Sequence, residues 1–375
     1  MPLYLSEEQT MLRDTARDFV GEQAPVSHMR ALRDGNNPDG FSRDLWKRFA
    51  EMGFTGILIG EDQGGLGLGH VEAGVVLEEI GRNLSPSPFL STAVAAVEAL
   101  KGTPHAARWF PGIVAGETVA ALAIDERAKH GSGITMRAER SGNGFKLSGT
   151  KQFVTHGHVA DLLIVAARTS WSEDESQGLT LFAVEAGAAG LSANPERLAD
   201  ASIAARLTFD GVEVDADAVI GEVDSGGEPL ERLLRAGRAG ASAELLGVGA
   251  GAMDMTMGYL KERKQFGVRI GSFQALQHRA AHLYSEMEVA RAAVLKAQQM
   301  LDSGDDRAGH AVSVAKAMTS LATTLSVQEG VQMHGGIGMT DEYDIGFYMK
   351  RGRVLAEMFG DANYHADQLA RAAGY

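Results

Sequence analysis

The texture of the sequence changes at Thr118, where helical patterns give way to short apolar runs. These runs are separated by Gly, Asn, Asp and Ser, which is typical of strands joined by turns. They cover residues 119–124, 144–147, 162–166, 179–184 and 205–209. A strand-rich insert between helical regions predicts a mainly α-helical chain with a central β domain. We expect an N-terminal helical domain at 1–117, the β domain at 118–225 and a C-terminal helical bundle at 226–375.

Helical patterns flank this insert on both sides. Ser6 and Gln9 have the spacing of a capping box, which predicts the start of a first helix. The C-terminal patterns, at 228–260, 273–301, 307–334 and a shorter one that contains 355–373, indicate a bundle. The first of them is rich in glycine. Because each glycine costs an isolated helix about 1 kcal/mol relative to alanine, we expect close neighbours to stabilise it.

Composition excludes several classes of function. The chain has 375 residues with 35 Lys and Arg against 49 Asp and Glu, a net charge of -14 that opposes binding to a nucleic-acid backbone. It has no cysteine, which removes disulfides and thiolate sites and is compatible with a reducing cytosol. We therefore expect a cytoplasmic protein. Its apolar runs are far shorter than the roughly 20 residues of a membrane helix, and no secretory signal is evident.

Two distant segments carry features of a site for an anionic ligand with a flat ring. Arg263 precedes Phe266 by three residues, which predicts that both lie on one helical face. A guanidinium matches phosphate oxygens, an aromatic ring offers a stacking surface, and Gln274 offers an amide. The second segment, 332–338, ends a long helical pattern with a glycine cluster that lets a ligand approach the backbone.

These two segments resemble motifs of the acyl-CoA dehydrogenase family, an Arg-x-x-Phe-Gly turn and a later Gln-x-x-Gly-Gly-x-Gly. The similarity extends to residues 52–82 and 147–157, and so covers nearly the whole chain. It implies an N-terminal helical domain, a β-barrel-like middle domain and a C-terminal four-helix bundle. The implied reaction is FAD-dependent α,β-dehydrogenation of an acyl-CoA: a carboxylate removes the α-proton and FAD accepts a hydride from the β-carbon. Electron-transfer flavoprotein is the implied electron acceptor.

The resemblance also assigns cofactor contacts residue by residue. The adenine and pyrophosphate side matches fully, at Arg263, Phe266, Gln274, Gln332, Gly335 and Gly336. The flavin-ring side matches only in part. It keeps Ser132 and Thr155, but Gly133 stands where the family has Asp, and Phe153 stands where it has Trp.

The largest departure from the family lies at the catalytic base. The family's Tyr-Glu-Gly-Thr aligns with 359–362, which puts Gly360 at the position of the Glu. A second position, used by some relatives, aligns with Gly237, just before Arg238, a substrate-binding candidate. Asp361 and Glu244 are the candidate substitutes. Structural roles are the alternative: Asp361 would cap a helix that begins near residue 362, and Glu244 would be a paired carboxylate between helices.

This pattern of losses resembles the small-subunit type of heteromeric acyl-CoA dehydrogenases, such as those acting on pimeloyl-CoA or on steroid side chains. Such a chain lends its adenine-side residues to a homologous partner's flavin in a heterotetramer, and the partner supplies the Glu. Three alternatives stay open: a homomeric dehydrogenase using Asp361 or Glu244, a non-catalytic acyl-CoA-binding or structural subunit, and an oxidase or monooxygenase of the same fold. No metal site is expected. His278, His282 and Glu286 share one predicted helix without facing ligands, and so do Glu357, Asp361 and His365.

Overall fold

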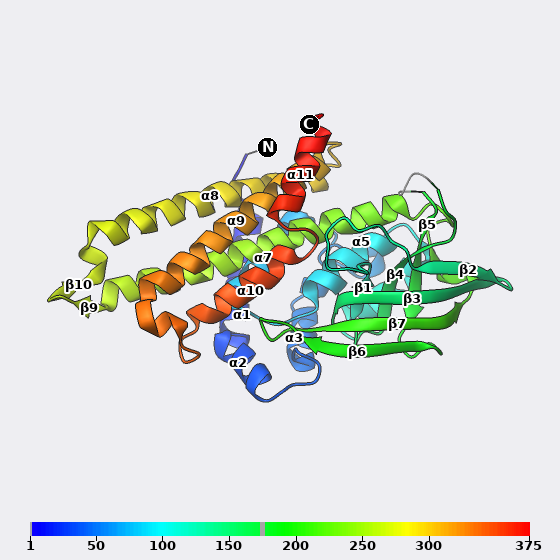
Figure 1. Ribbon diagram of the computed structural model, residues 1–375, viewed down its shortest axis with the longest axis horizontal. Helices are drawn as coiled ribbons and strands as arrows, with labels where there is room; N and C mark the ends of the chain where they lie inside the picture. The colour runs from blue at the N-terminus through cyan, green and yellow to red at the C-terminus, as the bar shows by residue number, and fades with distance from the viewer. Residues whose placement is uncertain (1, 173–176) are drawn as a thin grey trace. The chain divides into compact units, whose positions relative to one another are not determined.

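The computed structural model describes residues 2–172 and 177–375 and divides into two compact units (Figure 1). The helical unit comprises the chain up to residue 31, residues 69–85 and residues 238–375. The β-containing unit comprises residues 32–68 and 86–237. One long helix, α7 (Gly227–Glu262), begins in the β-containing unit and continues into the helical unit.

An eight-stranded sheet within the described residues confirms the central β domain. The strands are β1 (Ala120–Ala123), β2 (Arg137–Ser141), β3 (Gly144–Thr155), β4 (Leu162–Arg168), β5 (Leu179–Glu185), β6 (Leu191–Arg197), β7 (Ile203–Val214) and β8 (Val219–Ile220). Their order is β6-β7-β3-β2-β4-β5-β8, and β1 pairs in parallel with β4. The rings of Phe145 and Phe182 meet edge to face in its core, with centroids 5.2 Å apart. All five predicted strand segments lie in this sheet.

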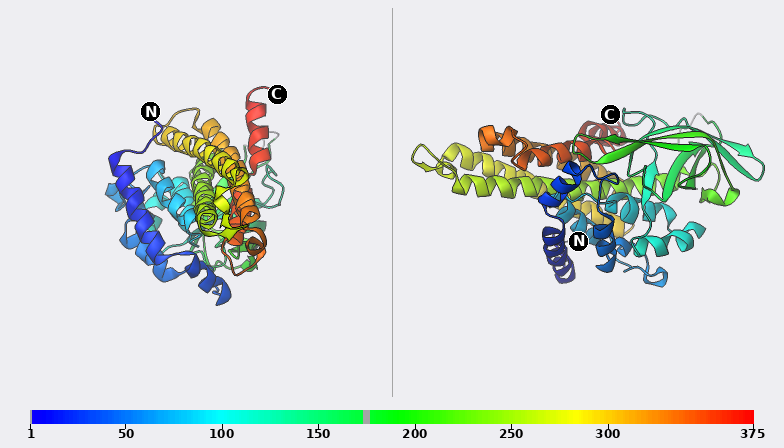
Figure 2. Two further views of the ribbon diagram at one scale, coloured as in Figure 1. Left: turned by 90° about the vertical axis from the view of Figure 1, so that its left-hand side faces the viewer. Right: turned by 90° about the horizontal axis from the view of Figure 1, so that it is seen from below.

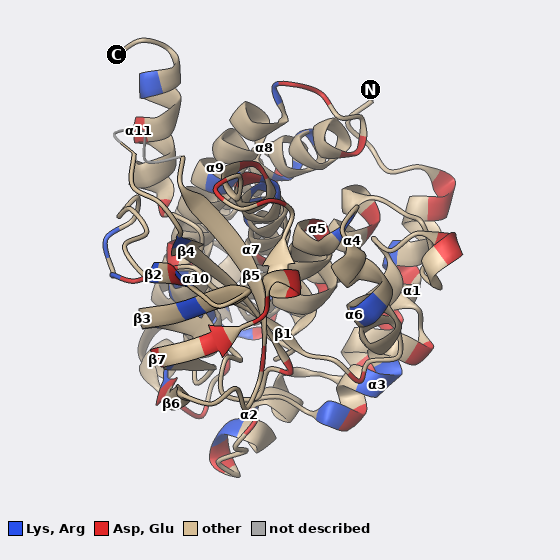
Figure 3. Cartoon of the chain, turned by 90° about the vertical axis from the view of Figure 1, so that its right-hand side faces the viewer, with Lys and Arg blue, Asp and Glu red and all other residues tan. Residues whose placement is uncertain are grey.

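The helices of the β-containing unit are short. They are α3 (Arg43–Glu51), a π-helix (Leu90–Ala96), α5 (Val97–Leu100) and α6 (Pro104–Val114). Figure 3 shows both signs of charge mixed along α3, whose charged residues include Arg43 and Asp44. Trp46 and Phe49 of the same helix are buried. This helix therefore has an ordinary solvated face opposite a core face.

The helical unit contains α1 (Glu7–Gln23), α4 (His70–Arg82), α8 (Gln274–Asp302), α9 (Ala308–His334), α10 (Ile345–Glu357) and α11 (Ala362–Ala372), and α2 (Val26–Asp34) begins in it. The capping box at Ser6 and Gln9 is confirmed. Helices α7, α8 and α9 run side by side (Figures 1 and 2) and share an apolar cluster that includes Leu246, Met287 and Ala322. Among the described residues, no helix is long and apolar enough to cross a bilayer.

Close contact between α4 and α7 explains the glycine-rich pattern of α7. A Cβ on Gly247 would lie 1.9 Å from the carbonyl oxygen of Glu78, and a Cβ on Gly81 would lie 2.1 Å from that of Glu244. The two backbones therefore meet where neither helix has a side chain. The expectation of close neighbours along this helix is confirmed.

The prediction that a single helix contains all of 355–373 was wrong. The segment contains the end of α10, a turn at 358–361 and then α11. Phe359 has a φ of +59° and Gly360 a φ of +105°, values that a right-handed helix cannot include. The helical spacing of the apolar residues continues across this turn, which is why the pattern concealed the break.

Candidate functional site

The residues predicted to contact the adenine and pyrophosphate lie in segments at one end of the helical unit, where Figure 1 labels β9 and β10 at its left. Arg263 follows the last residue of α7, and a hairpin of β9 (Lys264–Gln265) and β10 (Val268–Arg269) leads toward α8, which begins at Gln274. Gln332 lies in the last turn of α9, just before Gly335 and Gly336. An apolar cluster that includes Leu260, Leu283 and Met333 joins these ends of α7, α8 and α9.

The prediction that Arg263 and Phe266 share a helical face was wrong. Helix α7 ends at Glu262, and Phe266 and Gly267 have φ values of +56° and +78°. Two central residues with positive φ make a hairpin turn of the type that suits antiparallel strands. The turn projects Phe266 into solvent, where the residue is 88% exposed, and its ring lies edge to face with that of Phe273, with centroids 6.2 Å apart.

These residues fit a dinucleotide such as FAD. Arg263 and Gln332 are exposed, and a Cβ built on Gly335 or Gly336 would meet no atom within 4 Å, so their backbone is open to a ligand. Arg263 would hold the pyrophosphate, the ring of Phe266 would stack on adenine, and the glycine segment would admit the ligand to the backbone. Bound FAD supplies a hydride acceptor.

His334 supports this end of α9, and no sequence pattern indicated its role. Its ring packs against the rings of Tyr259 and Tyr343, tilted to both, with centroid distances of 4.5 and 4.9 Å. Its Nδ1 lies 2.6 Å from the carbonyl oxygen of Gly330. Burial lowers the pKa of His334, which favours the neutral ring. A neutral imidazole packed against two tyrosine rings therefore holds the end of α9 just before the glycine segment.

In the β-containing unit, the segment that carries Ser132 is organised around Glu126. The Glu126 carboxylate accepts hydrogen bonds from the backbone N–H groups of Thr135 and Met136 and from Lys151 Nζ, 2.8 Å away. Burial raises the pKa of Glu126, but the charge of Lys151 and these bonds outweigh it and lower the pKa overall. Lys151 is fully buried on β3, the strand that ends at Thr155. This ion pair, which the motif search missed, connects the segments of both flavin-ring candidates.

Gly360, at the position of the family's usual base, has no room for a side chain. A Cβ there would lie 2.4 Å from Cδ1 of Tyr364 and 2.9 Å from Nε2 of His365. Its φ of +105° is also one that residues with a Cβ rarely adopt. The structure therefore closes this position against a carboxylate.

Both candidate substitutes have structural partners. Asp361 is the N-cap of α11 and accepts the backbone N–H of Tyr364 at 2.7 Å, which confirms the capping role. Glu244 is 3% exposed and accepts hydrogen bonds from Nε and Nη2 of Arg351 at 3.1 and 2.5 Å, which confirms the paired role. Arg238, the substrate-binding candidate, donates from Nε to the carbonyl oxygen of Phe359 at 3.3 Å.

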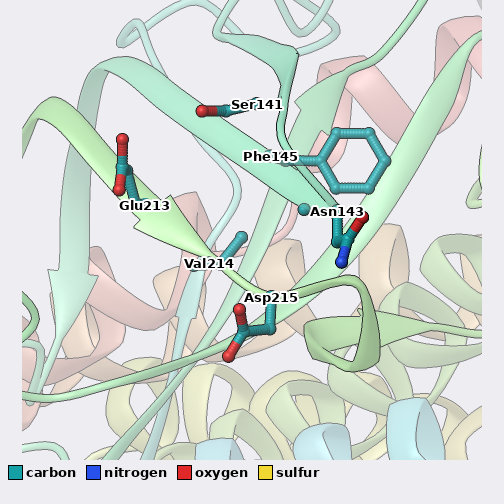
Figure 4. A pocket seen from close by; sticks show the side chains of 7 residues that line it. Ser141, Asn143, Phe145, Glu213, Val214 and Asp215 are labelled. Atoms are coloured by element: carbon teal, nitrogen blue, oxygen red, sulfur yellow. The ribbon is translucent and has the colours of Figure 1, made fainter.

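Two other features have little to offer a ligand. His282 and Glu286 form an exposed ion pair on α8, at 3.4 Å, as expected of solvated neighbours. A small hollow beside the β2–β3 turn is lined by Ser141, Asn143, Gly144, Phe145, Glu213, Val214 and Asp215 (Figure 4). Its charged lining residues are acidic, so it would repel the phosphates of a CoA thioester.

Comparison with known proteins agrees with this arrangement. The sequence matches the family profiles for the acyl-CoA dehydrogenase N-terminal domain at residues 6–117, the middle domain at 122–212 and the C-terminal domain at 224–374. Mitochondrial isovaleryl-CoA dehydrogenase of Pongo abelii is 30% identical over 385 residues, covering 98% of this chain and 89% of that protein. The chain belongs to the acyl-CoA dehydrogenase family. It is an FAD-dependent oxidoreductase that acts on CH–CH groups.

Solved structures of similar proteins share the whole fold of this acyl-CoA dehydrogenase. The ChsE4–ChsE5 complex from Mycobacterium tuberculosis is 27% identical, with a TM-score of 0.89 and full coverage of both chains. A structure described as a steroid ACAD variant is 32% identical, with a TM-score of 0.87, and covers 98% of this chain and 99% of that one.

Proposed function

We propose that this chain is one subunit of a hetero-oligomeric acyl-CoA dehydrogenase, and that this subunit lacks the catalytic base. It lends Arg263, Phe266, Gln274, Gln332, Gly335 and Gly336 to a flavin that a homologous partner also contacts. The partner supplies the catalytic Glu for α,β-dehydrogenation. Electrons leave to an electron-transfer flavoprotein.

The closed position at Gly360 is the observation that supports this proposal most strongly. A dehydrogenase needs a carboxylate to take the α-proton, and its pKa must be tuned by a site that leaves it free to react. Here the ring of Tyr364 and the imidazole of His365 leave no space for a side chain at residue 360. Asp361 is held in a helix cap and Glu244 in an ion pair with Arg351.

The residues that this chain retains bind and orient. Arg263 is a permanently charged donor for phosphate oxygens, and Phe266 offers a flat surface at low entropic cost because the hairpin already presents its ring. In the β-containing unit, the Glu126–Lys151 pair holds the segment of Ser132 in place. The chain therefore supplies binding and position, while proton removal requires another carboxylate.

We further propose a bulky acyl-CoA as substrate. The steroid-type structure supports this choice, because it matches nearly the full length of both chains at 32% identity. Steroid, dicarboxylic and straight-chain acyl-CoA thioesters, supplied separately, distinguish the substrate classes.

The deciding experiment is the visible absorption spectrum of the chain purified alone, with its ratio of FAD to protein and its response to anaerobic acyl-CoA. We expect a chain that is colourless or whose flavin does not bleach. Co-purification with a homologue that carries the usual Glu should give a yellow complex that bleaches. A chain that alone binds about one flavin and bleaches would overturn the proposal.

Two amide variants separate the proposal from a homomeric enzyme. Asp361→Asn and Glu244→Gln remove the carboxylates and nearly preserve side-chain shape. We expect neither variant to lower the rate of flavin bleaching in the complex by more than about threefold. A loss of roughly a thousandfold in either would identify that residue as the base.

A further inference from the structure

Lys316 is a buried charged residue that the proposed chemistry does not use. It lies on α9 and is fully buried, and its Nζ donates to the carbonyl oxygens of Ala356 and Gly360 at 2.9 and 2.8 Å. A third, longer contact of 3.4 Å joins it to Oγ of Ser320. The three acceptors match the three donors of an ammonium group.

One of the two carbonyls lies before the turn at 358–361 and the other lies within it. Ala356 is in the last turn of α10, where helix carbonyls lack partners within the helix and favour a nearby positive charge. Gly360 is the third residue of the turn and aligns with the family's usual base position. One ammonium group therefore joins the end of α10 to the turn itself.

Two further side chains hold the same turn. Nε of Arg238 on α7 donates to the carbonyl oxygen of Phe359 at 3.3 Å, and Nε2 of His365 on α11 lies 3.2 Å from the same oxygen. Phe359 has a φ of +59°, which is costly for an aromatic residue and persists only when its surroundings enforce it. Contacts from α7, α9 and α11 supply that enforcement.

We propose that Lys316 is a positioning residue for the turn at 358–361. Its two carbonyl contacts hold Gly360 in the conformation that closes the base position. The geometry is independent of the partner, whereas the meaning for catalysis rests on the proposed function.

The charges that face Lys316 make this contact sensitive to pH. Burial lowers the pKa of Lys316 to about 7, Glu357 and Asp361 oppose that shift, and Arg238 adds to it. His365 stays uncharged near neutral pH, because burial and its cationic neighbours lower its pKa to about 3. Above pH 7 the ammonium therefore loses one of its three donor protons, and the contact with the turn weakens.

Hydrogen exchange, followed by mass spectrometry on the purified chain, tests the proposal. We compare wild type with Lys316→Met and Lys316→Arg at pH 6 and pH 8.5, after correction for intrinsic exchange rates. Lys350→Met, an exposed lysine on α10, is the matched control. We expect Lys316→Met to speed exchange of residues 358–364 at least tenfold, Lys316→Arg to do so less, and the control to change nothing.

In wild type, the same amides should be better protected at pH 6 than at pH 8.5, and Lys316→Met should abolish this difference. Unchanged exchange at 358–364, or a uniform rise across the helical unit, would overturn the proposal. The wild-type pH comparison decides even if Lys316→Met does not fold. The exchange experiment uses neither flavin nor partner, so its result does not depend on the proposed function. If the flavin of the chain alone bleaches in the absorption experiment, the proposed function is refuted and the exchange result still holds.

Discussion

At the scale of single residues, His365 should make folding sensitive to acid. It is fully buried, and its folded pKa of about 3 lies below the roughly 6.5 of an exposed histidine. Between these values only the unfolded chain binds the proton, so stability is lost as pH falls from about 6.5 to about 3. We expect the free energy of unfolding of His365→Gln, measured with urea, to fall less steeply with decreasing pH than that of wild type. The two slopes should differ by up to about 1.4 kcal/mol per pH unit.

The exposed His282 provides the control for that slope. Its side chain is 62% exposed and lies 3.4 Å from Glu286 at the surface. His282→Gln should keep the wild-type pH dependence, because exposed ion pairs contribute little to stability. Equal slopes in wild type and His365→Gln would show that His365 titrates as freely as a surface residue.

The sequence suggested cofactor contacts by side-chain chemistry, and it described their conformation poorly. Arg263 and Phe266 stay predicted contacts, because guanidinium and aromatic side chains suit a nucleotide. The prediction that they share a helical face was wrong, because two adjacent residues with positive φ form a hairpin turn there. The spacing of residues along a helix carries no information about such a turn. The roles of Lys316 and His365 could not be read from sequence, since each depends on backbone carbonyls that only the turn at 358–361 brings together.

At the scale of elements, the contact between α4 and α7 can be tested with two glycines of one helix. Gly247→Ala puts a Cβ 1.9 Å from a backbone oxygen of α4, so it should cost about 1–3 kcal/mol of unfolding free energy. Gly258→Ala meets no atom within 4 Å and should stabilise by about 0.5–1 kcal/mol through helix propensity. Denaturant unfolding measures both. Two variants of equal stability would contradict the close approach.

The elements that sequence reasoning missed share a physical cause. Strand β6 is an edge strand with mostly exposed residues and contains Pro195, which an edge tolerates. Strand β2 buries only Ala138. A search for apolar runs finds strands that are buried on both faces, such as β4, and overlooks strands held by pairing alone. Strands were therefore predictable where burial requires apolar residues. They were not predictable where hydrogen bonds to neighbouring strands hold a segment of mostly polar residues.

At the scale of the whole molecule, the central prediction is that this chain contributes residues to a flavin site, and that reduction of the flavin by acyl-CoA requires the partner. Phe266 is 88% exposed, so Phe266→Ala should change the unfolding free energy of the flavin-free chain by less than about 0.5 kcal/mol. In a complex with a Glu-bearing homologue it should weaken FAD binding about tenfold, because an aromatic stacking contact is worth about 1–3 kcal/mol.

Trp171→Ala is the matched control, since Trp171 is another aromatic residue with a largely exposed side chain, at 63%, and lies in the β-containing unit. FAD affinity, measured by the change in flavin fluorescence when FAD binds, should be unchanged in that variant. If Phe266→Ala instead leaves the affinity of the complex intact, the hairpin is not part of a cofactor site. The exposed ring would then need another ligand to explain it, and the proposal that one subunit completes another's flavin site would fail.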